Sequence, residues 1–80
     1  MSMASTTVID ERTTIFNAIR LEQRRAVATE SAVLETAAAF ADVDAETLTA
    51  TFEQLRREGE IYTYPKEGKA VVRITDEVLA

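Results

Sequence analysis

The spacing of apolar residues predicts a first helix near the start of the chain. The pattern Thr7-x-x-Asp10 is typical of a helix start, so we expect the helix to begin near Thr7 or Asp10 and to run to about Arg24. Four apolar residues then share one side of it at 3.6 residues per turn: Val8, Ile15, Phe16 and Ile19. Leu21 falls outside that stripe, which indicates a helix contacted on more than one side.

A second helix is predicted over residues 30–41, after a short connector at residues 26–28 that allows one extended step. Its apolar face would consist of Val33, Leu34, Ala37, Phe40 and Ala41. The small Ala37-Ala38-Ala39 run would let a neighbouring helix approach closely.

The third helix, residues 44–58, has the clearest start and end signals. Asp44 is a suitable N-cap residue that would accept a backbone N–H, and Val43 with Leu48 fits the hydrophobic staple. Gly59 is expected to end the helix at the C′ position. Between these signals runs one buried stripe, Leu48, Phe52 and Leu55. The gap before this helix is so short that a sharp helix-turn-helix corner follows.

After Gly59 the period changes to about two residues, which predicts a β-hairpin. Residues 61–64 are β-favouring, residues 65–68 have turn chemistry, and residues 69–75 form the return strand. A lone two-stranded hairpin is marginally stable, so it must pack on the helices. The expected fold is therefore α+β: a winged helix-turn-helix of three helices plus a C-terminal two-stranded wing.

Composition limits what this domain can do. The chain has 80 residues, enough for one small domain; we expect a disordered tail at residues 1–6 and a winged-helix domain over residues 7–80. It has no Cys and no His, so thiolate zinc sites, disulfides and the commonest general base are excluded. We expect no enzymatic activity, no metal and no cofactor. No signal peptide or membrane segment is visible, which predicts a cytoplasmic protein.

The charge balance is acidic, with nine basic and fourteen acidic residues and a net charge of −5. Only Lys66 and Lys69 are lysines, and Ala and Thr are abundant. This composition resembles that of proteins from salt-loving archaea, and an ordinary acidic protein is the alternative. A net-acidic domain does not by itself indicate nucleic-acid binding.

One phrase carries a resemblance to a known family. Leu55-Arg56-Arg57-Glu58-Gly59-Glu60-Ile61-Tyr62, with Val43-Asp44-Ala45-Glu46 before it and Lys66-Glu67-Gly68-Lys69 after it, resembles the C-terminal winged-helix domain of archaeal minichromosome maintenance helicases. The likeness covers residues 26–75, and small archaeal winged-helix regulators resemble the chain comparably. The ATPase motifs of that helicase are missing. The resemblance implies contact with double-stranded DNA through helix three and the wing, in DNA replication or transcription regulation.

The candidate DNA-binding residues lie on those two elements. Residues 56–73 carry five basic and three acidic residues, a local excess of positive charge in an acidic chain. The candidates are Gln54, Arg56, Arg57, Lys66, Lys69 and Arg73. Tyr62 and Tyr64 share one strand face, where packing is the plainer interpretation and base stacking the other.

Each candidate also has a purely structural interpretation. Arg56 and Arg57 would complement the helix dipole, and lysines at a hairpin edge prevent strand addition. Glu46 and Glu53 lie on the face that would enter a major groove, where they would repel phosphates. Two alternatives therefore stay open: a winged helix that binds a replication or transcription protein without DNA, and a homodimer. A homodimer would use Leu21 and the terminal Val78-Leu79; otherwise the chain is a monomer.

Overall fold

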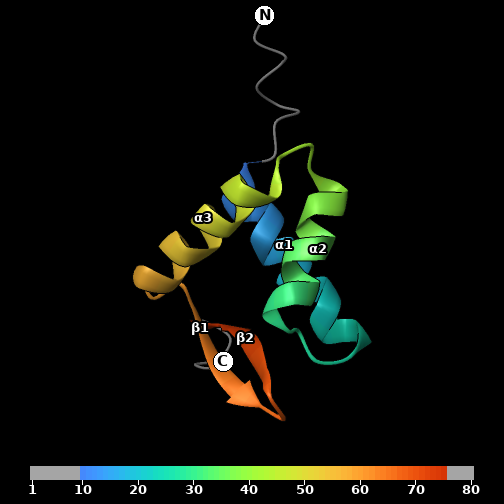
Figure 1. Cartoon of the computed structure of the whole chain (residues 1–80), viewed down its shortest axis with the longest axis vertical. Coiled ribbons are helices and arrows are strands. Elements are labelled where there is room, and N and C mark those ends of the chain that lie inside the picture. The colour runs from blue at the N-terminus through green and yellow to red at the C-terminus, as the bar shows by residue number, and fades with distance from the viewer. Residues whose placement is uncertain (1–9, 76–80) are drawn as a thin grey trace, which may run out of the picture.

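The structure is a computed structural model that describes residues 10–75. Its elements follow the expected order: α1 (Glu11–Arg25), α2 (Glu30–Phe40), α3 (Ala45–Arg57), β1 (Ile61–Lys66) and β2 (Lys69–Ile74). Three helices gather at one end and an antiparallel hairpin packs against them at the other, as in a winged helix (Figure 1). The α+β prediction is confirmed. The predictions for residues 1–9 and 76–80, which include Val8, Val78 and Leu79, lie outside the described residues.

Side chains and backbone groups at the helix ends set the boundaries. Asp10 caps α1: its carboxylate accepts from the backbone N–H of Thr13 at 2.8 Å, and this hydrogen bond lowers the pKa of Asp10. Thr29 caps α2 in the same way. Asp44 occupies the N-cap position of α3 as predicted, but its carboxylate accepts from the hydroxyl of Thr47 at 2.6 Å instead of from a backbone N–H. That hydroxyl bond lowers the pKa of Asp44.

Gly59 ends α3 as predicted, in a left-handed conformation with a φ of +80°. The N–H of Gly59 donates to the carbonyl of Arg56, and the N–H of Glu60 donates to that of Leu55. These two bonds form a Schellman motif, which turns the chain out of α3 and into β1. Thr75 fixes the same corner, because its hydroxyl donates to the carbonyl of Gly59 at 2.6 Å.

One continuous core joins the helices to the hairpin. Ile15 and Ile19 of α1, Val33 and Ala37 of α2, and the predicted α3 stripe are fully buried. The hairpin adds its inner face to this cluster: Ile61, Val72 and Ile74. Val43 packs on the same core, as the predicted staple with Leu48 requires.

The predicted apolar face of α2 is wrong at its end. Phe40 is 60% exposed, whereas Val33 and Ala37 are fully buried. Phe40 is the last residue of α2, so it lies beyond the last position of the helix that the core covers. Ala41 is half-buried and is the cap residue after the helix.

The hairpin turn is tighter than predicted. Pro65 and Lys66 belong to β1, paired with Ala70 and Lys69, so only Glu67 and Gly68 form the loop. Both loop residues have positive φ, as a two-residue type I′ turn requires. The extra pairs extend the hairpin beyond the helices and set Lys66 opposite Lys69.

The connector between α1 and α2 adds a short third strand segment to the hairpin. Thr29 forms an antiparallel bridge with Val71, and the N–H of Val72 donates to the carbonyl of Ala28 at 2.8 Å. The extended step expected in this connector is therefore present, and it covers part of the free edge of β2.

Candidate nucleic-acid interface

The candidates on α3 are mostly held by neighbouring side chains. The amide of Gln54 donates to Glu58 at 2.8 Å, and Arg12 at the start of α1 donates to the same carboxylate at 2.9 Å. The Gln54 amide and the Arg12 guanidinium together hold the pKa of Glu58 below its ordinary value. The guanidinium of Arg56 pairs with Glu53 one turn earlier. Gln54 and Arg56 are thus each hydrogen-bonded to a carboxylate of the same helix or its cap.

Arg57 is the exception on this helix. It is exposed, and it makes no ion pair or hydrogen bond with the described part of the chain. It lies in the last turn of α3, where a cation complements the helix dipole. Among the candidates of α3, Arg57 alone keeps its full donor set for an external ligand.

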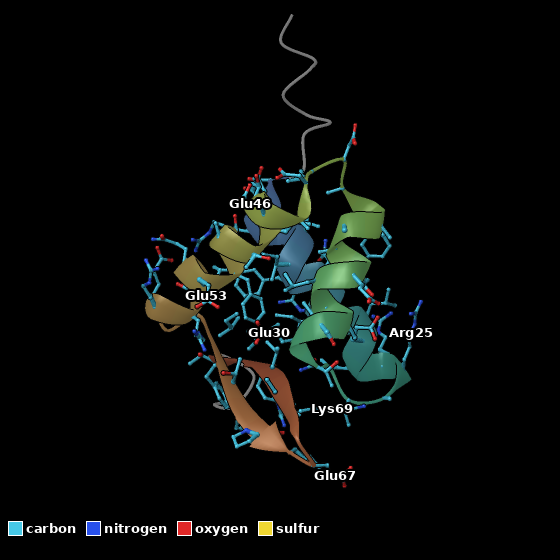
Figure 2. The ribbon with its side chains drawn as sticks, in the orientation of Figure 1. Arg25, Glu30, Glu46, Glu53, Glu67 and Lys69 are labelled. Carbon is cyan, nitrogen blue, oxygen red and sulfur yellow. The ribbon has the colours of Figure 1, made fainter. Side chains whose placement is uncertain are left out.

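The remaining charged side chains of α3 are both carboxylates, Glu46 and Glu53. Figure 2 shows Glu46 near the start of the helix and Glu53 further along it, both away from the hairpin tip. A hollow of about 510 Å³ lies between α3 and the start of α1, and its charged lining is Glu11, Arg12 and Glu46. Two carboxylates against one guanidinium make this side a poor surface for phosphates.

The hairpin brings the remaining candidates together. Lys66 and Lys69 are exposed and directly opposite each other at the tip, without an ion-pair partner among residues 10–75. Figure 2 shows Glu67 at the extreme tip, with Lys69 on the side that faces the α1–α2 connector. Arg73 lies four pairs further from the tip than Lys69, and it is half-buried with an Nε that has no hydrogen-bond partner.

A second hollow, of about 390 Å³, lies between the hairpin and the end of α1. Its polar lining consists of Gln23, Tyr64, Lys66 and Arg73, with no carboxylate. Sequence reasoning did not connect Gln23 or the connector with the hairpin. The pairing of Val71 with Thr29 makes that connection, and no local sequence pattern specifies it.

Other chemical sites are not assembled in the described residues. Across residues 10–75, no group of three or more Asp, Glu, His or Cys side chains gathers as metal ligands would. None of the described helices has the length and apolar character needed to cross a membrane. Leu21, considered for a dimer surface, is half-buried.

Comparisons with known proteins add no family to this picture. No protein-family model matches the chain, and neither a curated protein nor a solved structure matches it. The architecture is therefore established by its own elements: three helices followed by a C-terminal antiparallel hairpin packed against them, as in a winged helix.

Proposed function

We propose that this domain binds nucleic acid, gripping the phosphates of double-stranded DNA with the wing and the end of α3. The observation that supports this most is the pair Lys66 and Lys69. Like charges directly opposite each other destabilise a hairpin, and no carboxylate among the described residues forms an ion pair with either lysine. An external polyanion would relieve the repulsion and release counterions.

Arg57 adds a proposed phosphate contact at the C-terminal end of α3. The rest of that helix approaches the major groove without hydrogen-bonding to base edges. Gln54 and Arg56 are engaged with Glu58 and Glu53, so base readout would first have to break those bonds. We therefore infer weak, largely sequence-independent binding. The resemblance of residues 26–75 to archaeal winged helices supports a role in DNA replication or transcription regulation.

Titration of a labelled duplex at several salt concentrations tests this proposal. We expect binding at low salt, with the K66A/K69A double variant weaker and its salt slope smaller by about 2. The single variants K66A and K69A are compared with Arg24→Ala as a matched control. That substitution also removes one positive charge, from an exposed position at the end of α1. Equal losses in R24A and K66A would reduce the effect to net charge, and no binding at low salt would overturn the proposal.

A second function is supported by α3 itself. The helix carries the carboxylates Glu46 and Glu53, and its Gln54 and Arg56 are already bonded to Glu58 and Glu53. Such a surface suits a basic protein partner better than DNA. Capture of partners from the native cytoplasm in high salt, with Glu46→Gln as control, tests this alternative. A partner that the native domain retains and E46Q loses would support it, and recovery of no partner would count against it.

A further inference from the structure

The strand register gives the hairpin two different faces. Side chains of directly opposite residues lie on the same side of a sheet, and successive residues alternate. The inner face carries the pairs Ile61–Ile74 and Thr63–Val72 against the core. The hairpin outer face carries three pairs: Tyr62–Arg73, Tyr64–Val71 and Lys66–Lys69. It thus combines two tyrosines and three cations with no carboxylate.

The two tyrosines form a small aromatic surface. Their ring centroids are 6.3 Å apart with planes inclined by 31°, and Tyr62 is 36% exposed. Burial in the core does not account for these rings, because the core lies on the other face. Val71 is paired with Tyr64 on one side and with Thr29 of the α1–α2 connector on the other, and it is 3% exposed.

Cations surround the aromatic surface at both ends. Lys66 and Lys69 lie toward the tip, and Arg73 lies beside Tyr62 toward the base. The hollow of about 390 Å³ runs along the same face, between Tyr64 and Gln23 of α1. The side chains of Arg73 and Gln23 line this hollow, and both residue types carry hydrogen-bond donors.

We propose that the hairpin outer face binds single-stranded nucleic acid, with unpaired bases stacked on Tyr62 and Tyr64 and phosphates held by Lys66, Lys69 and Arg73. Every base has a π-face, so aromatic side chains in a basic groove accept a strand without reading its sequence. A duplex cannot use the rings, because its bases are already stacked on each other. An acidic peptide would satisfy the lysines but would leave the aromatic surface unused.

This inference rests on the proposed nucleic-acid function and specifies which form of nucleic acid the outer face takes. The chain contains two tyrosines and no tryptophan, so its tyrosine emission comes entirely from Tyr62 and Tyr64. Stacking of a base on either ring should therefore lower the tyrosine emission of the protein.

The experiment titrates the full chain with fluorescein-labelled oligothymidylate, measuring anisotropy for affinity and tyrosine emission for contact. We expect quenching that saturates with binding, and an affinity at least about fivefold lower in Tyr62→Leu. Tyr62→Phe is the matched control, because it keeps the ring and should bind like the native chain. Tyr62 is preferred to the less exposed Tyr64, and far-UV circular dichroism verifies that the variant is folded.

Three results would overturn the inference: native affinity in Y62L, saturable binding without quenching, or polyphosphate or polyglutamate bound as tightly as the oligonucleotide. A parallel titration with duplex separates this inference from the proposed function. Duplex binding lost in K66A/K69A, together with single-strand binding unchanged in Y62L, refutes the stacking site alone. If the chain does not bind duplex but binds single strands in a way that depends on Tyr62, the stacking site is supported and the proposed duplex binding is refuted.

Discussion

Glu22 shows how one buried charge joins two helices. It lies near the end of α1, is 9% exposed, and accepts a hydrogen bond from the hydroxyl of Thr36 on α2 at 2.5 Å. Arg25 donates to the same oxygen at 3.3 Å from a largely exposed position. Because a buried carboxylate is costly without donors, the Thr36 hydroxyl should contribute to stability.

Thr36→Val tests that contribution, since valine keeps the shape of threonine and removes only the donor. We expect the free energy of unfolding to fall by about 1–2 kcal/mol in urea denaturation. Thr49→Val is the control, because Thr49 is exposed on α3; it should change stability by less than about 0.5 kcal/mol. A T36V variant as stable as the native chain would show that water replaces the hydroxyl.

Glu58 gives the molecule a pH dependence with a definite sign. Its pKa is lowered, first by the amide of Gln54 and then by Arg12, so the folded state favours the carboxylate. A group with a depressed pKa stabilises the fold at neutral pH, and that contribution is lost as pH falls through the folded-state pKa. We expect Glu58→Gln to be less stable than the native chain at pH 7 and to approach it near pH 3.

Urea midpoints of both chains at the two pH values check this expectation. Glu35→Gln serves as control: Glu35 is exposed on α2 and has no ion-pair partner among the described residues. The difference between E35Q and the native chain should be small and nearly the same at both values. A constant gap between E58Q and the native chain would contradict the assigned roles of Gln54 and Arg12.

At the scale of elements, the end of α3 depends on one backbone conformation. Gly59 has a φ of +80°, and a Cβ added there would meet no atom within 4 Å. We therefore expect Gly59→Ala to lower the free energy of unfolding by about 1 kcal/mol, which is the cost of the left-handed conformation alone. Gly59→Asn should lose less, because asparagine tolerates this region. A clearly larger loss in G59A, measured by urea denaturation, would mean that the corner into β1 has moved.

Local signals explain why the helices were predictable. Gly59 and the Leu48-Phe52-Leu55 stripe act within a few residues of sequence and occupy their predicted places. Of the two expected starts of α1, Thr7 and Asp10, the structure has Asp10 as the N-cap. Phe40 was mispredicted because periodicity gives the side of a helix without saying how far the core extends along it.

The candidate site was less predictable than the fold because it depends on pairing. A turn over residues 65–68 would have left Lys66 in a loop, whereas the two-residue turn places it opposite Lys69 and on the side of the tyrosines. Gly68 signals a turn but not its length. Helical spacing does indicate the bonds of Gln54 to Glu58 and of Arg56 to Glu53, which span four and three residues. The bond from Arg12 to Glu58 joins residues far apart in the sequence, and no local pattern indicates it.

At the scale of the whole molecule, the net charge of −5 is unevenly distributed. The hairpin outer face carries three cations, while α3 carries Glu46 and Glu53 and α1 begins with Glu11. Salt therefore acts in opposite directions on stability and on binding. It screens repulsion within the acidic body, and it competes with the cations for phosphates.

Salt also separates the phosphate grip from base stacking. With three cations on phosphates, the logarithm of affinity should fall with the logarithm of salt at a slope of about −3 for duplex and about −2 for single strands. Stacking on Tyr62 releases no ions, so the fold-loss of Y62L on oligothymidylate should stay constant from about 50 mM to about 1 M salt. The fold-loss of K66A/K69A should shrink toward one over the same range. If both losses shrink together in anisotropy titrations, Tyr62 acts through the charges beside it, and the ring does not carry a base.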